Sequence, residues 1–573
     1  MHALFPCSAG RGAAIGSIPE QIVHVTRDIA GLAEANQLTS VLNWRPQQRL
    51  VGDPRLLVVN MSTNKPAFPS IQGIRHAEPE PPESTQPNNE SLHRKAKLGA
   101  VILVARLVAL QVIVLGGDVS LRRKLSPSDF GLFAIVQFTL TFFTLFGDAG
   151  LGGALIQTKD EPTQRQLSSI WAFQMLFALA IVLAIWFSAP LIFFVWPDVS
   201  QSAVWLVRAL SIGLLLTACR TVPMLLMERH LQFGRLSALD VVLSVSFYVT
   251  AVVLSQLGFG VMALVGAVLV QSVLSTIGAF WLRRWRPSFI LDWQELSPVL
   301  RFGATYQMKN LLGFASSAIA PVCGGRMLGQ AGLGFINWAQ STAYFPLRLV
   351  EVMSRVSFPL YSRLQDDARS FARAFDRSLQ ISVLGNLFFI GLGLGIGPNL
   401  VRVVYTTKWL PGLPLFYIFL TGISIGFFAP LAAPALDAIG KPQINARFSV
   451  GWTVASLILV AVATPKWGAV GYVVGICVPM VVGNALLMLL IAKKFPEVKL
   501  WQGCRASLAG CVLVGVVGRW IALRHVQGAL SLVAVVLLLA VLFLSVVALL
   551  DRPFARSCVA MLKARKVQVT AGP

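Results

Sequence analysis

LSPSDFGLFAIVQFTLTFFTLFGDAGLGGALIQ, residues 125–157, combines a polar turn, a long apolar segment and a glycine-rich break. Pro127 and Asp129 lie in the turn, and Gly147 begins the break. Proline and aspartate start helices and turns, whereas clustered glycines end regular structure. An apolar helix bounded in this way is typical of a membrane span.

The turn and its helix recur in part about 203 residues later. Leu125-Ser126-x-x-x-Phe130-Gly131-Leu132 is matched by Leu328-Gly329-x-x-x-Leu333-Gly334-Phe335. Upstream, Lys97-Leu98-Gly99-Ala100 is matched by Arg301-Phe302-Gly303-Ala304 at an offset of about 204. Two similar helix–turn–helix units at one offset predict a duplicated membrane bundle.

Composition places the chain in the membrane. Of its residues, 55% are hydrophobic and only 13% are charged, whereas soluble domains carry about 25% charged residues. The net charge of +23 comes from basic residues in short loops between apolar segments, so we expect topology signals and no nucleic-acid partner. The seven cysteines show no CxxC pairing and no spacing with the histidines that suits a metal. We expect no metal and no cofactor.

About fourteen apolar segments are long enough to cross a membrane as helices. This predicts an all-α membrane protein with two pseudo-symmetric six-helix lobes and a C-terminal helix pair. The expected domains are a disordered region, two lobes, helices 13–14 and a basic cytoplasmic tail, over residues 1–92, 93–295, 296–495, 496–551 and 552–573. Met61 is an alternative start, in which case residues 1–60 are not translated. The connection from Tyr361 to Arg377 has the pattern of an amphipathic interfacial helix, but a solvated helix that covers the bundle is the favoured interpretation.

Several motifs resemble the polysaccharide transporter family of the multidrug/oligosaccharidyl-lipid/polysaccharide superfamily. This family includes the O-antigen and exopolysaccharide flippases. The resemblance covers residues from about 95 to about 495. It rests on the quoted turn and helix, on Thr407-Lys408-Trp409 with Pro411, on Ala438-Ile439-Gly440-Lys441-Pro442, and on the run from Arg355 to Gln365.

The resemblance implies a flippase that moves a polyprenyl-pyrophosphate-linked oligosaccharide across the bacterial inner membrane for exopolysaccharide, O-antigen or capsule synthesis. It also implies a polysaccharide polymerase and chain-length or export proteins as partners, and a fold like that of the multidrug transporters. The loop charges predict that both termini are cytoplasmic. The basic run Arg122–Lys124 opposes that rule, with contact to anionic headgroups as its only interpretation here.

Charged side chains inside membrane spans are costly and mark candidate sites. A diphosphate needs cationic partners to cross hydrocarbon, and guanidinium groups supply charge-assisted hydrogen bonds. The expected substrate-binding residues are Arg106, Arg208, Lys309, Arg348, Asn310 and Gln340. Arg106 and Asn310 occupy equivalent places in the repeat.

Two acids are candidates for ion coupling, and each has a structural alternative. Asp240 lies where it could instead pair with Arg220 or Arg235, and Glu351 is spaced to pair with Arg348 and Arg355 along one helix face. For both acids the structural role is favoured.

No catalytic motif is present. The chain has no GxxxxGK[ST] nucleotide loop, no GxSxG elbow and no HExxH zinc motif, so we expect a non-enzyme. A cation-coupled multidrug antiporter is the first alternative, although cationic drugs call for acids in the cavity. A membrane polysaccharide polymerase or ligase is the second alternative. Such an enzyme needs a long outer loop, and this chain lacks one.

Overall fold

The computed structural model describes residues 110–147, 161–230, 232–297, 299–300, 314, 317–365, 367–498, 500–525, 528–553 and 556. The predicted disordered region, Arg106, Lys309, Asn310 and most of the basic tail lie outside these residues. Every regular element of the described part is helical, so the predicted all-α class is confirmed.

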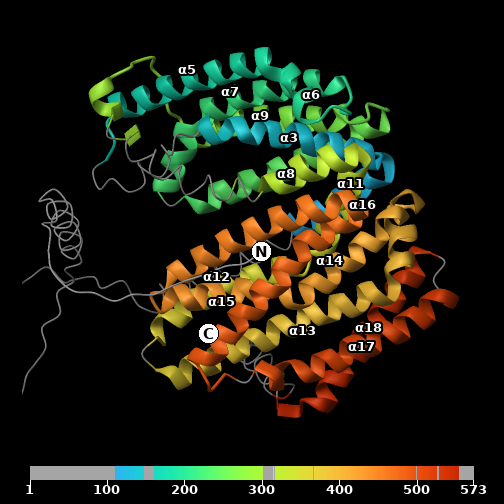
Figure 1. The fold of residues 1–573 in the computed structure, drawn as a ribbon. Coiled ribbons are helices and arrows are strands. Elements are labelled where there is room, and N and C mark those ends of the chain that lie inside the picture. The colour runs from blue at the N-terminus through green and yellow to red at the C-terminus, as the bar shows by residue number, and fades with distance from the viewer. Residues whose placement is uncertain are drawn as a thin grey trace, which may run out of the picture. The chain divides into compact units, whose positions relative to one another are not determined.

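The first group of helices precedes residue 283. Residues 110–124 are helical. The following elements are α3 (Pro127–Gly147), α5 (Gln164–Ser188), η1 (Ala189–Leu191), α6 (Ile192–Val195), α7 (Ser202–Arg229), α8 (Phe233–Gln256) and α9 (Met262–Leu282). In Figure 1 these helices form the cyan and green layers, with α5, α7 and α9 stacked beside α3.

The second group follows residue 318. It comprises η2 (Ile319–Gly324), α11 (Gly325–Ala343), α12 (Leu347–Arg363), α13 (Ala368–Leu400), η3 (Val401–Tyr405), η4 (Thr407–Gly412), α14 (Leu413–Gly426), α15 (Ala429–Ala438), α16 (Pro442–Lys494), α17 (Leu500–His525) and α18 (Ala529–Leu550). α13 packs along α17, and α17 packs along α18 (Figure 1). α11 packs on α3 and so joins the two groups. The predicted domain boundaries stay a prediction.

The helices of the described residues agree with the predicted spans. Nine helices of the described part are long and apolar enough to cross a membrane. One of them, α16, changes direction at Gly468, whose φ of 57° requires glycine, so it is two spans in one assigned helix. α3 and the joined pair α11–α12 account for two more predicted crossings, and the segments predicted as the first and seventh, near residues 98–117 and 303–323, lie largely outside the described residues.

The connection at residues 361–377 is not one separate interfacial helix, because it is divided between α12 and α13. α12 ends at Arg363, and the Asp367 carboxylate then accepts hydrogen bonds from the backbone N–H groups of Arg369 and Ser370 at the start of α13. Phe371 and Phe375 are fully buried against Tyr361, so this part of α13 packs on the bundle, in agreement with the favoured interpretation. The segment is therefore a capped turn between two core helices. The hydrogen bonds from Ser370 also lower the pKa of Asp367.

Candidate functional site

A cavity of about 500 Å³ lies where the 110–124 helix, α3, α8, α11 and the segment before it meet. Phenylalanine rings from α3 and α8 form much of its apolar wall. Its polar lining consists of Asp118, Arg122, Gln137, Thr141, Tyr248, Ser317, Asn337 and Gln340. Among the described residues of this wall, Arg122 is the only cation and Asp118 the only acid.

Arg122 is held on every side. Its side chain is 4% exposed, and its Nε contacts Asp118 Oδ2 at 2.6 Å. Its Nη2 donates to Ser341 Oγ at 3.3 Å and, more weakly, to Asn337 Oδ1 at 3.5 Å. The guanidinium carbon lies 4.6 Å from the centre of the Phe130 ring and 5.3 Å from that of Trp409. The third nitrogen, Nη1, is buried and has no hydrogen-bond partner among the described residues.

An unsatisfied N–H on a buried guanidinium is costly, because it has lost water without gaining an acceptor. Aromatic rings stabilise the positive charge but accept no strong hydrogen bond. An anion that reached Nη1 would supply the missing acceptor. The arrangement is therefore suited to binding an anionic group at the wall of the cavity.

Two glycines bring α3 and α11 into direct contact near this arginine. A Cβ on Gly131 would collide with the carbonyl group of Gln330, and a Cβ on Gly334 would collide with that of Pro127. Gly131 and Gly334 are equivalent positions of the sequence repeat, and so are Pro127 and Gln330. The crossing therefore has the reciprocal geometry of a pseudo-two-fold axis.

Two buried tryptophans make similar hydrogen bonds to the segments that precede α3 and α11. Trp409, in η4, donates from Nε1 to the carbonyl of Arg122 at 2.8 Å. Trp196, directly after α6, donates from Nε1 to the carbonyl of Pro321 in η2 at 2.7 Å. The two tryptophan hydrogen bonds, together with the contact of α3 and α11 at Gly131 and Gly334, are called the closure.

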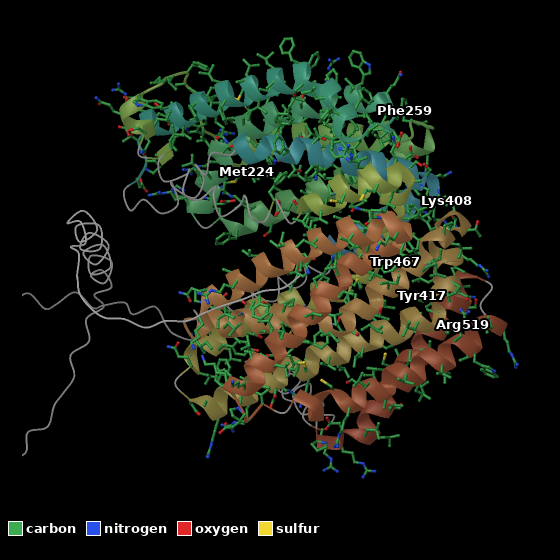
Figure 2. All side chains as sticks on the ribbon, viewed as in Figure 1. Met224, Phe259, Lys408, Tyr417, Trp467 and Arg519 are labelled. Carbon is green, nitrogen blue, oxygen red and sulfur yellow. The ribbon has the colours of Figure 1, made fainter. Side chains whose placement is uncertain are left out.

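Basic side chains add to the closure. Lys408 Nζ donates to the carbonyls of Arg123 and Leu125 at 2.9 and 2.6 Å. Arg123 Nη1 donates to the carbonyls of Val403 and Val404 at 2.9 and 3.2 Å. In Figure 2, Lys408 lies toward the same end of the helices as Phe259 and Trp467, which mark other connections between spans. The closure therefore lies toward one end of the helices (Figure 2).

The structure places Arg208 away from the cavity. Its Nε and Nη2 donate to the carbonyl of Trp186 at 3.2 and 3.0 Å, and its guanidinium lies against the rings of Trp186 and Trp205. Both tryptophans are exposed. Arginine with exposed tryptophan is typical of a membrane interface, where the charged group extends toward headgroups.

Two other predicted binding residues lie nearer the site. Gln340 lines the cavity. Arg348 is exposed, donates to Gln111 Oε1 at 3.2 Å and lies within electrostatic range of Tyr248 in the cavity wall.

The two predicted coupling acids do not line the cavity. Asp240, on α8, lies within electrostatic range of Arg220, as its structural alternative predicts. Arg220 in turn donates to Ser275 on α9. Glu351 is exposed on α12.

Sequence reasoning missed the pair Asp118–Arg122. The available signal was the basic run Arg122–Lys124 at a place where basic residues are unexpected, with Asp118 four residues before it. A cation that opposes the topology rule and has an acid at i−4 indicates a site.

Comparison with known families bears directly on this region. A family described as "Polysaccharide biosynthesis protein" matches residues 121–414, just over half of the chain, including Arg122, both crossing glycines and Trp409. The chain belongs to this polysaccharide biosynthesis family. The expected membership, membrane transport class and non-enzymatic nature are confirmed.

Curated relatives include other members involved in polysaccharide synthesis. The lipopolysaccharide biosynthesis protein WzxC of Escherichia coli (strain K12) is 23% identical over 69% of this chain and 79% of its own length. The succinoglycan biosynthesis transport protein ExoT of Rhizobium meliloti (strain 1021) is 25% identical over 78% and 91%. The teichuronic acid biosynthesis protein TuaB of Bacillus subtilis (strain 168) is 25% identical, but the match spans only 56% of that protein and 47% of this chain.

Solved structures show the fold of this family member. The inward closed conformation of the lipid II flippase MurJ matches with a TM-score of 0.65 at 15% identity, over 79% of this chain and 99% of that one. An inward-facing multidrug resistance MATE family transporter of the MOP superfamily matches with a TM-score of 0.53 at 14% identity, over 69% and 98%. The predicted transporter fold is therefore confirmed.

Proposed function

We propose that this chain moves a polyprenyl-pyrophosphate-linked oligosaccharide from the cytoplasmic to the outer leaflet of the bacterial inner membrane. The observation that carries the proposal is Arg122, a buried guanidinium in the cavity wall with one unsatisfied nitrogen. A diphosphate is the part of such a cargo that cannot enter about 30 Å of hydrocarbon without a charged partner.

The rest of the wall suits the other parts of the cargo. Asn337, Gln340, Ser317 and Thr141 supply amides and hydroxyls that bind sugar hydroxyls. The polyprenyl chain stays in the bilayer and need not enter. Arg106, Lys309, Asn310 and Arg348 are proposed to extend the anion site, which a multivalent diphosphate can share.

The relatives' names support this substrate class, because they refer to lipopolysaccharide, succinoglycan and teichuronic acid biosynthesis. A polymerase that consumes the delivered unit, chain-length or export proteins, and cytoplasmic termini belong to the same proposal. The cation-coupled drug antiporter has less support. A pocket for cationic drugs needs an unpaired acid, whereas Asp118 in this wall already contacts Arg122.

Replacing Arg122 tests the function. Arg122→Gln removes the charge but keeps hydrogen-bonding capacity. We expect polymer export in cells to fall at least about tenfold, the effect of losing one charge-assisted hydrogen bond. Lipid-linked oligosaccharide should accumulate on the cytoplasmic leaflet, measured by its protection from an impermeant glycosidase.

Arg208→Gln is the matched control, since Arg208 contacts tryptophans outside the cavity. Its export should stay close to that of the wild type. Normal export by Arg122→Gln, present at wild-type level in the membrane, would rule out the proposed site.

A further inference from the structure

We propose that Asp118 is an internal competitor of the cargo: its carboxylate occupies Arg122 in the empty carrier and is displaced by the diphosphate. The inference rests on the proposed function and adds a specific residue to it. Asp118 would set how tightly the carrier holds its cargo, and hence how readily it releases it.

The two members of the pair differ in accessibility. The Arg122 side chain is 4% exposed, whereas that of Asp118 is 30% exposed, at a separation of 2.6 Å between Nε and Oδ2. The other acceptor side chains on Arg122, Asn337 and Ser341, are neutral. Asp118 is thus the one charged partner of Arg122 among the described residues, and the one that can rotate toward open volume.

Other charged or titratable groups near Asp118 supply no second anion. Tyr248 on α8 and Tyr405 in η3 lie within electrostatic range of both Asp118 and Arg122. Arg348 on α12 lies within range of Tyr248. Phenols are neutral near neutral pH, so the carboxylate is the anion with which an entering phosphate must compete.

Competition has a clear physical purpose in a carrier. A buried guanidinium without a counter-charge is strongly unfavourable, so an empty site needs an anion of its own. A site with no such anion would bind the diphosphate more tightly and release it more slowly. Asp118 therefore keeps the empty cavity neutral and lowers the affinity for cargo.

Diphosphate binding to Asp118→Asn tests the inference. The full chain in lipid nanodiscs is titrated calorimetrically with farnesyl pyrophosphate, and farnesol serves as the uncharged reference. We expect Asp118→Asn to bind the pyrophosphate about tenfold more tightly than the wild type, because the competing charge is gone. In cells the same variant should export less polymer, since release becomes slow.

A purely structural role for Asp118 gives the opposite sign, because a misplaced Arg122 binds anions less well. Equal or weaker pyrophosphate binding by Asp118→Asn would therefore overturn the inference. Asp118→Glu, which retains a carboxylate, should return the affinity toward the wild-type value. Asp292→Asn makes the same charge change in another Asp–Arg pair, 2.8 Å from Arg165 and outside the cavity, and should bind as the wild type does.

If Asp118→Asn is unstable alone, the pyrophosphate must restore the folded protein, because its charge replaces the missing carboxylate; failure to restore it also overturns the inference. The proposed function fails in a different way. In that case neither the wild type nor Asp118→Asn binds farnesyl pyrophosphate better than farnesol.

Discussion

Trp409 contacts both the anion site at Arg122 and the closure. Its ring lies against the Arg122 guanidinium, and its indole N–H donates to the Arg122 carbonyl. The side chain is fully buried among Phe130, Phe335 and Trp338. A movement of Arg122 toward cargo must therefore disturb the contact that holds η4 against the 110–124 helix.

Trp409→Phe keeps an aromatic ring but removes the donor. We expect it to leave the Arg122 carbonyl unsatisfied and to destabilise the closed state by about 1–3 kcal/mol. In a variant without native cysteines, Gln340→Cys should then react faster with a membrane-impermeant thiol reagent added on the side of the closure.

Trp467→Phe is the control for this experiment. Trp467 lies toward the same end of the helices (Figure 2) but is 62% exposed. It should leave the reaction rate unchanged. An unchanged rate in Trp409→Phe as well would show that its hydrogen bond does not hold the closure.

At the scale of elements, the contact between α3 and α11 depends on the absence of side chains at two equivalent positions. Gly131 faces the backbone of Gln330, and Gly334 faces that of Pro127. Helices approach this closely only at small residues, which is a common way to pack membrane spans. The repeat in the sequence thus appears in space as a symmetric crossing.

Gly334→Ala places a Cβ against the Pro127 carbonyl, which belongs to backbone and cannot rotate away. We expect a cost of about 1–3 kcal/mol to the closed state, seen as a lower midpoint of thermal unfolding and faster labelling of the cysteine at Gln340. Gly451→Ala, in α16 with open space around it, is the matched control. If Gly334→Ala and Gly451→Ala have the same thermal midpoint and labelling rate, the glycine crossing does not stabilise the closed state.

For the whole molecule, we propose that the cavity and the closure belong to one state of a carrier that opens to alternate sides. Most of one buried core lies in each group of helices, and the two cores meet at the closure, where Phe130 and Leu264 join the core of the second group and Leu333 joins that of the first. We propose that the pseudo-symmetric contacts at this meeting point separate as a unit. In such carriers the repeats move against each other around a fixed site. The closure must therefore open once per transport cycle.

A cross-link across the closure tests this cycle. Cysteines at Arg123 and Val404, joined in the native protein by a hydrogen bond of 3.2 Å, can be bridged by a short bifunctional thiol reagent. We expect the bridged protein to lose nearly all transport of lipid-linked oligosaccharide in proteoliposomes, and reduction of a cleavable bridge to restore it. Each single cysteine treated alike should remain active, and full transport by the bridged form would exclude an opening at this end.

Several features follow from the sequence alone. Apolar segments of about 20 residues with so little charge can be stable only as membrane helices, and the repeat at Gly131 and Gly334 predicted the duplication. The sequence also pointed to Gln340 as a polar residue suited to binding sugars, and this residue lies on α11 and lines the cavity.

The tertiary structure alone decided which charges matter. A sequence shows that Arg208 and Arg122 are both cationic, but not that exposed tryptophans hold the first while Asp118 and the cavity enclose the second. Burial depends on neighbours from distant spans: Asn337 and Ser341 lie more than 200 positions from Arg122, although its counter-charge, Asp118, is four residues away. Local pattern determines where helices form, whereas packing between helices determines which of their charged residues can meet a ligand.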